Sequence, residues 1–224
     1  SNAIKEAAAA ALTAAGLNAD DYKIEVKADA TKAEDSTVDA DVVIVGAGGA
    51  GMTAAITAAA EGKSVVIVES QAMVGGNSAR ATGGMNAAKT VYQDENEFDQ
   101  AAGVEKTLAT AAEKYADNET ITALAKTVSE QWAAYQANPT GYFDSVELME
   151  LDTMVGGKGI NDPELVETLC EGTADAIDWL DENGITLHSV SSFGGASVKR
   201  IHRPVNAEGK TLSVGSYMIP LLQE

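Results

Sequence analysis

A glycine-rich run is the part of this sequence whose residue types and spacing point most directly to chemistry. Gly46, Gly48 and Gly51 form a G-x-G-x-x-G pattern, with Gly49 and Ala50 between them. In such a loop the first glycine permits a tight turn, the second lets a pyrophosphate approach the backbone, and the third lets a helix pack close to a strand. The pyrophosphate would lie on the N-terminus of that helix, where unpaired N–H groups and the helix dipole favour negative charge.

The elements that must position this loop are predicted on both sides of it. Residues 42–45 are a β-branched run typical of a strand buried on both faces, and residues 64–68 are a second such run. Small residues over 52–61 favour a close-packed helix between them, so the three elements form one βαβ unit. Glu69 ends the second strand, 18 residues beyond Gly51. A carboxylate there can accept both hydroxyls of an adenosine ribose and disfavours NADP, whereas FAD and NAD both remain open.

A second glycine-rich strip, residues 75–87, reads GGNSARATGGMNA. Two later blocks contain DTM, GG, INDP and DW over 152–179 and GGASVKRIHRP over 194–204. With the three blocks in this order, residues 41–204 resemble the FAD-dependent fumarate reductase family, meaning the soluble flavocytochrome c type and relatives such as urocanate reductase. The resemblance favours FAD, because the strip has no role in an NAD-dependent dehydrogenase.

The resemblance implies a non-covalent FAD site. The backbone around Ala50 would cradle the pyrophosphate, Glu69 would hold the ribose, and the strip would run along the FAD towards its isoalloxazine ring. A glycine-rich strip also gives backbone N–H donors close access to flavin carbonyls and N5. The predicted cofactor-binding residues are Gly46, Gly48, Gly49, Ala50, Gly51, Glu69, Asn77, Ser78, Thr82, Gly83 and Gly84.

The same resemblance places no catalytic residue within residues 1–224. In the family, the His and Arg residues that bind the substrate carboxylates and the Arg that delivers the proton come after the position matching Glu224, together with a mobile capping domain. His202 and Arg203 lie outside those catalytic positions, and we expect them to shape a loop near the flavin. We therefore expect the N-terminal portion of a larger flavoprotein, with no fumarate or urocanate reduction by this chain alone.

The chain divides into three predicted parts. Residues 1–30, with an alanine-rich helix at 4–15 and a strand at 23–27, resemble the end of a preceding FMN-carrying domain. Its Ser-Gly-Ala-Thr attachment motif is absent here, so covalent FMN is expected only in an upstream domain. Residues 31–40 are polar and lack periodicity, as a linker does. Residues 41–224 form the predicted incomplete FAD-binding domain, an α/β fold built on the Rossmann-like βαβ unit.

Further helices are predicted beyond the βαβ unit. Residues 97–137 have the spacing of a helical hairpin, an insertion relative to the soluble flavocytochrome type, which we expect to lie solvated on the surface. A single helix is predicted over 163–182, begun by a capping side chain and a proline, with Leu165, Leu169, Ala176 and Leu180 on its apolar face. Pro220 is expected to interrupt a helix near the C-terminus.

The composition excludes several kinds of partner and site. The 224 residues carry 15 basic and 34 acidic side chains, a formal charge of −19, whereas nucleic-acid binding needs clustered Lys and Arg. No apolar run approaches the roughly 20 residues that span a bilayer. One cysteine, Cys170, and two histidines predict neither a disulfide within the chain nor a metal site, and Cys170 is expected to be buried.

These observations favour the FAD-binding portion of an oxidoreductase that reduces an activated C=C bond next to a carboxylate by hydride transfer from flavin N5. An NAD-dependent dehydrogenase fragment and a non-catalytic nucleotide-binding or surface fragment remain the alternatives. Fumarate, urocanate, another enoate and a ketosteroid all stay open as substrates. We expect a bacterial protein of the cell surface or extracellular space, with the cytoplasm left open, and self-association through exposed strand edges.

Overall fold

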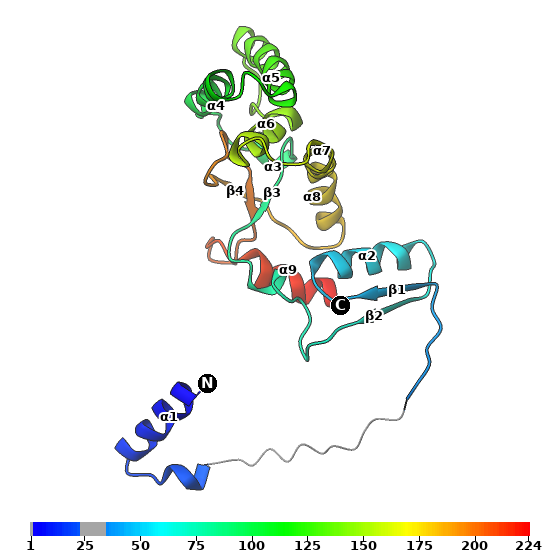
Figure 1. The fold of residues 1–224 in the computed structure, drawn as a ribbon, viewed down its shortest axis with the longest axis vertical. Coiled ribbons are helices and arrows are strands. Elements are labelled where there is room, and N and C mark those ends of the chain that lie inside the picture. The colour runs from blue at the N-terminus through cyan, green and yellow to red at the C-terminus, as the bar shows by residue number, and fades with distance from the viewer. Residues whose placement is uncertain (1, 23–34) are drawn as a thin grey trace. The chain divides into compact units, whose positions relative to one another are not determined.

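The computed structural model describes residues 2–22 and 35–224, and the chain forms two compact units. The first unit is Ser1–Asp39 and the second is Ala40–Glu224. Figure 1 shows the elements of each.

The first unit contains helix α1 (Asn2–Ala14) and the 3₁₀ turn η1 (Ala19–Tyr22), and neither has a buried residue. The helix agrees with the prediction for 4–15. The strand predicted at 23–27 lies outside the described residues, and residues 35–40 have no regular secondary structure. The assignment of this unit to a preceding FMN-carrying domain stays a prediction.

The second unit begins with the predicted βαβ arrangement. Strands β1 (Val42–Val45) and β2 (Val65–Val68) are parallel, and helix α2 (Gly49–Ala60) connects them. Val42 pairs with Val65 at the start of the strands, and Asp41 ties the same end to the chain before β2 by accepting the N–H of Ser64 at 2.8 Å. The glycine loop therefore lies at the opposite, carboxyl end of β1. The prediction of an α/β fold built on a βαβ unit is confirmed.

The prediction that both strands are buried on both faces is wrong for this chain. Helix α2 covers only one face of the β1–β2 pair, and the side chains of Val43 and Val45 on the other face are 58% and 87% exposed. Within the described residues β1 and β2 pair only with each other. The β-branched run thus has the composition of a fully covered strand but is covered on one side.

Most of the remaining core is helical. Helices α4 (Ala101–Lys114) and α5 (Glu119–Ala137) form the predicted hairpin, which packs on α6 (Val146–Gly156), a helix that the sequence analysis missed. The hairpin packs on the surface of α6 through one face, because fully buried side chains of both its helices belong to the same hydrophobic cluster as α6, while most of its other residues are exposed. The cluster includes Val104, Ile121, Val128, Leu148, Leu151 and Met154.

The single helix predicted over 163–182 is two helices in the structure. Helix α7 (Pro163–Glu171) ends at Gly172, and α8 (Thr173–Glu182) begins directly after it. The predicted apolar face is also wrong in α7, since Leu165 and Leu169 are 69% and 59% exposed while Val166 and Cys170 are buried. The expected burial of Cys170 is confirmed, and burial raises the pKa of its thiol to about 11.

A small antiparallel sheet brings together segments of the second unit that are more than 100 residues apart in the sequence. Strand β5 (Ile201–Arg203) lies between β3 (Met85–Asn86) and β4 (Ser189–Ser191), and the one-turn helix α3 (Val91–Asp94) follows β3. The chain then ends in α9 (Val214–Gln223), which is red in Figure 1.

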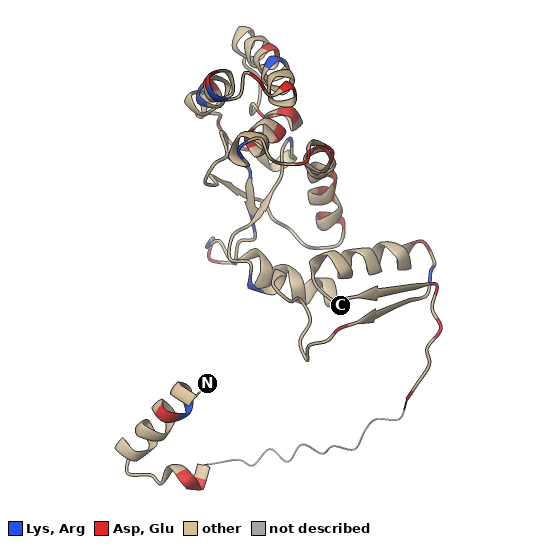
Figure 2. Cartoon of the chain, viewed as in Figure 1, with Lys and Arg blue, Asp and Glu red and all other residues tan. Residues whose placement is uncertain are grey.

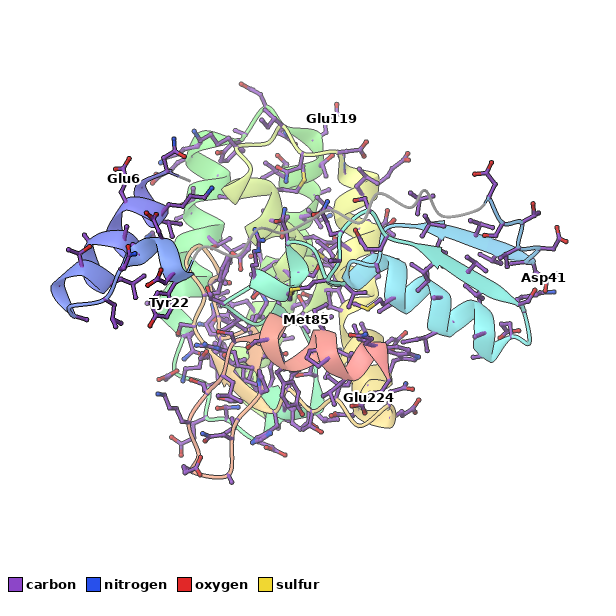
Figure 3. The ribbon with its side chains drawn as sticks, turned by 90° about the horizontal axis from the view of Figure 1, so that it is seen from below. Glu6, Tyr22, Asp41, Met85, Glu119 and Glu224 are labelled. Carbon is purple, nitrogen blue, oxygen red and sulfur yellow. The ribbon has the colours of Figure 1, made fainter. Side chains whose placement is uncertain are left out.

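Helix α9 packs against α2 and against the second glycine strip. Figure 3 shows α9 beside the Met85 region, with Asp41 at the far end of the βαβ unit. Pro220 does not interrupt this helix, contrary to expectation. Ile219 and Leu222, on either side of the proline, are buried in a second hydrophobic cluster that also contains Met52, Ile177 and Leu180.

Charged residues are distributed unevenly over the second unit. Figure 2 shows Asp and Glu along α4 to α8, whereas β1, α2 and β2 carry no charged side chain within their bounds. The uncharged helix α2 and its glycine loop therefore keep the positive electrostatic potential of a helix N-terminus without competition from a local carboxylate in the first turn.

Candidate functional site

The glycine loop is shaped by two glycines that this chain itself requires. Gly46 has φ +100°, a left-handed conformation that side chains rarely adopt. A Cβ on Gly51 would overlap the carbonyl oxygen of Gly46 and would lie 3.3 Å from Cγ2 of Ile44 on β1. These two glycines therefore turn the chain out of β1 and bring α2 against the strand.

Gly48 differs, because nothing in the part of the chain that the structure describes requires a glycine there. It is the N-cap residue of α2 with φ −79° and ψ −179°, a conformation open to any residue. The atoms nearest to an added Cβ would be the carbonyl oxygen of Gly75 and the hydroxyl oxygen of Ser78, each 3.9 Å away. The lack of a side chain at position 48 thus leaves open space in front of the helix.

The N-terminus of α2 has unused hydrogen-bond donors facing that space. The N–H of Gly49 donates to Oγ of Ser78 at 3.2 Å. The N–H groups of Ala50 and Gly51 have no acceptor within the described residues, and no side chain caps the helix. Unpaired N–H groups at a helix N-terminus, together with the helix dipole, form a binding site for an anion.

Glu69 lies directly beside the loop. Its Oε2 accepts the N–H of Ala47 at 2.8 Å, and its Oε1 accepts the N–H of Gln71 at the same distance. These backbone hydrogen bonds lower the pKa of the Glu69 carboxyl, so the group is anionic at neutral pH. The carboxylate is held at the carboxyl ends of both strands, and each oxygen retains capacity for a further donor.

The second glycine strip starts against the same loop. The N–H of Gly75 donates to the carbonyl of Ala47 at 2.7 Å, and Gly75 has φ +98°. Ser78 begins the short 3₁₀ turn η2 (Ser78–Arg80), which places its hydroxyl at α2, while the Asn77 side chain is exposed. Residues from 46 to 51, Glu69 and Ser78, predicted from separate parts of the sequence, are thus brought together.

The rest of the strip, Thr82 to Gly84, is held from the C-terminal part of the chain. The Arg203 guanidinium donates to the Thr82 carbonyl at 3.2 Å, and the N–H of Val214 donates to the Gly83 carbonyl at 3.2 Å. A Cβ on Gly84 would overlap the carbonyl oxygen of His202. Glycine at 84 is therefore required for close packing of the strip on β5.

Helix α9 supports the strip, and the sequence analysis did not anticipate this role. The N–H of Gly215 donates to the Ala81 carbonyl at 3.0 Å, and a Cβ on Gly215 would overlap the carbonyl of Ser78. Ile219 packs so closely on Gly75 that an added Cβ there would lie 2.7 Å from its Cγ2. The small residue at the first turn of α9 is a sequence signal that could have pointed to this close approach.

His202 and Arg203 both make contacts that hold neighbouring backbone, and their expected place near the flavin stays a prediction. His202 is fully buried, with Nδ1 2.7 Å from the Arg200 carbonyl and Nε2 2.7 Å from Oγ1 of Thr90. The carbonyl can only accept, so Nδ1 carries the proton and Nε2 accepts from the threonine. Burial lowers the pKa of His202, and the neutral ring has no free nitrogen for acid–base chemistry.

A buried charge cluster fixes the segment that leads into β5. The Arg200 guanidinium is bidentate to Asp144, with Nε–Oδ2 at 2.8 Å, and it also donates to Asp152 at 2.6 Å. Burial alone would lower the pKa of Arg200, but the two carboxylates more than offset it and raise that pKa. Asp152 further accepts the N–H and hydroxyl of Ser197 at 2.8 and 2.7 Å.

Two of the cavities that adjoin these elements lie at the ends of the predicted cofactor site. One of about 200 Å³ lies at the carboxyl end of β2 and includes Ala47, Glu69 and Val74 in its lining. The other, of about 460 Å³, lies where Met85 and Asn86 at the end of the strip meet α6, α7 and the loop at Phe193 to Ala196. The Oδ1 atom of Asn86 is buried and has no hydrogen-bond partner among the described residues.

Other kinds of site find no support in the described part of the chain. Over residues 2–22 and 35–224, no group of three or more His, Cys, Asp or Glu side chains is arranged to hold a metal ion. None of the helices in those ranges has the length and apolar character needed to cross a membrane.

Comparison with known proteins agrees with this geometry. The sequence model of the FAD binding domain family matches residues 41–143 and 131–223. "Fumarate reductase (cytochrome)" of Shewanella frigidimarina is 36% identical over 184 residues, which covers 82% of this chain and 24% of that protein. "Urocanate reductase" of Eggerthella lenta is 34% identical over 201 residues, covering 89% of this chain and 26% of the relative. The chain thus spans about a quarter of the length of these relatives.

A solved structure shows the same similarity in three dimensions. The open conformation of a flavocytochrome c3 fumarate reductase has a TM-score of 0.56 and 28% identity, and the match covers 90% of this chain and 30% of that one. The predicted resemblance and the preference for FAD are confirmed at the level of the family. With the glycine loop, the acidic residue after β2 and the glycine strip all in place, the chain belongs to the FAD binding domain family.

Proposed function

We propose that this chain is the FAD-binding portion of an oxidoreductase that reduces an activated C=C bond next to a carboxylate. The observation that carries the proposal is the N-terminus of α2, where two N–H groups have no acceptor among residues 2–22 and 35–224 and face the space beside Gly48, a position at which those residues do not require glycine. A bound pyrophosphate explains both features, because it accepts those N–H groups and occupies the space that a side chain on Gly48 would fill.

Each predicted site residue has a proposed part in holding FAD. The amides of Ala50 and Gly51 would bind the pyrophosphate, and Ser78, already bonded to Gly49, would orient that end of the loop. Glu69 would accept from the adenosine ribose while its bonds to Ala47 and Gln71 keep it anionic. The strip from Asn77 to Gly84 would lie along the cofactor towards the flavin ring, with its backbone groups as the contacts.

When bound, FAD supplies the acceptor and donor of a hydride at flavin N5. The chain's own contribution is positioning and the exclusion of water. Arg203, Val214 and Gly215 hold the strip by its carbonyls, which fixes the remaining backbone groups at Gly83 and Gly84. The neutral, fully bonded His202 braces β5 behind the strip and moves no proton.

The proposed substrate is a small unsaturated carboxylate. The names of the two relatives, fumarate reductase and urocanate reductase, both describe reduction of a C=C bond conjugated to a carboxylate. The cavity of about 460 Å³ beside Met85 and Asn86 adjoins the flavin end of the strip, and it is the proposed approach for such a substrate. The groups that bind the substrate carboxylate are proposed to lie outside residues 1–224.

The origin of the first unit and the location of the whole protein are proposed as well. The first unit would belong to an FMN-carrying domain, and the whole protein would act at the bacterial surface or outside the cell. The family match supports FAD against the NAD-dependent alternative. Two measurements distinguish the proposal from a non-catalytic nucleotide-binding or surface fragment. One is FAD binding by a Gly48→Val variant, and the other is assay of the full-length protein with an enoate.

Replacing Gly48 with valine tests the cofactor site. The side chain would occupy the pyrophosphate position, so we expect FAD affinity to fall by about 10- to 100-fold, since overpacking costs typically 1–3 kcal/mol. Because an added Cβ meets no neighbour closer than 3.9 Å, the thermal unfolding curve should change little. FAD affinity is measured by titration with fluorescence detection, and flavin content by the absorbance of the purified protein.

Gly172→Val is the matched control. Gly172 also has an ordinary backbone conformation, with φ −82°, and space for a side chain, but it lies between α7 and α8 away from the loop. This variant should bind FAD like the parent chain. Normal FAD binding by Gly48→Val would contradict the proposed site.

A further inference from the structure

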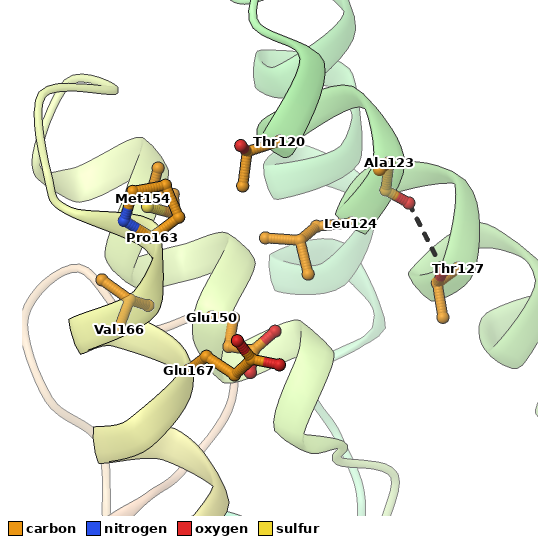
Figure 4. Close-up of a pocket in the computed structure, with 9 residues that line it drawn as sticks. All are labelled: Thr120, Ala123, Leu124, Thr127, Glu150, Met154, Pro163, Val166 and Glu167. Carbon is orange, nitrogen blue, oxygen red and sulfur yellow. Dashed lines mark hydrogen bonds between the residues drawn. The ribbon is translucent and has the colours of Figure 1, made fainter.

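A groove between α5, α6 and α7 lies outside the proposed cofactor site. It has a volume of about 360 Å³, in the range of small-molecule sites. Figure 4 shows Glu150 and Glu167 close together at one end of it, with two threonines and several apolar side chains along the remainder. The lining residues are Thr120, Ala123, Leu124, Thr127, Glu150, Met154, Pro163, Val166 and Glu167.

Glu150 is the feature of this groove that needs an explanation. It is only 8% exposed, yet its carboxylate makes no hydrogen bond or ion pair within residues 2–22 and 35–224. The side chain lines two cavities, and the carboxylate oxygens are not among the buried atoms that lack a partner, so they open into these cavities without a cation beside them in the described residues. Burial, together with the neighbouring carboxylates of Glu147, Glu167 and Glu171, raises the pKa of Glu150.

The polar surroundings of Glu150 are also incompletely satisfied. Glu150 and Glu167 line a second, adjoining cavity of about 520 Å³, together with Glu147, Glu171 and Gln131. The Oε1 atom of Gln131 is buried and has no hydrogen-bond partner among the described residues. Lys89 lines the same cavity, and its positive charge contributes to lowering the pKa of the Glu147 carboxyl. No cation of the described residues pairs with Glu150, so acceptors are in excess at that end of the groove.

The chemistry of the groove favours an organic cation over a metal ion. The carboxylates do not form a group of three or more placed to coordinate a metal, as found for the whole described part of the chain. Apolar side chains of Leu124, Met154 and Val166 extend from the acidic end. An ammonium group with a short hydrocarbon chain matches both ends, because Lys-like cations pair with carboxylates while the chain is buried on apolar surface.

We propose that this groove binds a small organic cation of the alkylammonium class, with the ammonium between Glu150 and Glu167 and the hydrocarbon chain against Leu124, Met154 and Val166. The ligand would supply the missing partner of Glu150 and contact the apolar side chains that line the groove between α5, α6 and α7. This site is separate from the proposed FAD site and does not depend on it.

Calorimetric titration of the chain with hexylammonium chloride tests the proposal. We expect saturable binding at one site, with 1-hexanol, which has the same chain but no charge, bound at least about tenfold more weakly, because hydrogen bonds to charged groups contribute about 1.5–3 kcal/mol. Glu150→Gln should weaken hexylammonium binding by about tenfold or more. It preserves side-chain shape and removes a buried unpaired charge, so the variant should fold.

Two further variants make the result specific. Glu164→Gln removes one negative charge from an exposed position on α7, the helix that carries Glu167, and should leave binding unchanged. Ala123→Phe, at an exposed position of the apolar wall, should block the groove and abolish binding without loss of helix content. Equal affinity of the parent chain and Glu150→Gln would show attraction to the acidic surface only and would overturn the proposal, as would equal affinity for 1-hexanol.

Discussion

The βαβ unit and the helical region are built on opposite plans. In the helical region, α4, α5 and α6 enclose a cluster of fully buried side chains that includes Val104, Val128 and Leu148. In the βαβ unit, α2 covers one face of two strands, and Val45 on the other face is 87% exposed. The helical region thus has a closed core of its own, whereas the βαβ unit has uncovered valines and, within the described residues, N–H groups without acceptors at its helix.

The contrast separates residues needed for folding from residues needed for a ligand. Gly51 and Gly84 are required by neighbouring backbone atoms, whereas nothing among the described residues requires the missing side chain at Gly48 or accepts the N–H groups of Ala50 and Gly51. Arg200 belongs to the first kind, because it ties the segment before β5 to Asp144 and to Asp152 on α6. Mutations in the two regions should therefore separate stability from cofactor affinity.

The largest expected effect is on the free energy of unfolding of an Arg200→Met variant. Removing the guanidinium leaves Asp144 and Asp152 as buried carboxylates without their cation, and breaking a buried pair costs about 3–5 kcal/mol. Urea unfolding followed by circular dichroism measures the loss. The control is Lys199→Met at the adjacent residue, whose bridge to Asp99 is exposed and contributes about 0–1 kcal/mol. Similar losses in both variants would show that the buried cluster has no special role.

A smaller effect, on cofactor affinity, is expected for Glu69→Ala. Loss of two charge-assisted bonds to the ribose should weaken FAD binding by roughly tenfold to a hundredfold. The conservative variant Glu69→Gln keeps acceptors and should lose less. Titration with FAD gives the affinities. Glu69→Ala also loses the hydrogen bonds to Ala47 and Gln71, so urea unfolding without FAD measures how far the variant is destabilised by that loss alone. Unchanged flavin content in Glu69→Ala would remove this residue from the proposed site.

The smallest effect on stability is expected for Val45→Lys. The side chain is 87% exposed, so the free energy of unfolding should change by less than about 0.5 kcal/mol. Self-association should fall, because a charge on an exposed β-strand opposes pairing with another chain. Sedimentation velocity of the parent, Val45→Lys and the control Val91→Lys, a 59% exposed position on α3, tests this. A parent chain that stays monomeric at all concentrations would contradict the predicted self-association.

The sequence by itself determined the features that depend on local backbone geometry. The glycines of the loop, the β-branched strands on both sides of it and the acidic residue after β2 predicted the βαβ unit, because each residue type there answers a local steric or hydrogen-bonding need. The hairpin over 97–137 was predicted from periodicity, and Asn118 between its helices caps α5 by accepting the N–H of Ile121 at 3.0 Å. The family resemblance added the FAD strip.

Only the tertiary structure decided which surfaces are covered. Helix α6 was missed because it is surrounded by other elements and buries Glu150 and Asp152 along with its apolar residues, so no one-sided pattern marks it. In α7 the leucines are exposed and Val166 and Cys170 are buried, since the neighbouring helices determine which face is covered. Helix α9 continues through Pro220 because burial of the side chains around the proline offsets the missing hydrogen bond. Side-chain pattern gives the period of an element, but its partners are set by packing between residues far apart in the sequence.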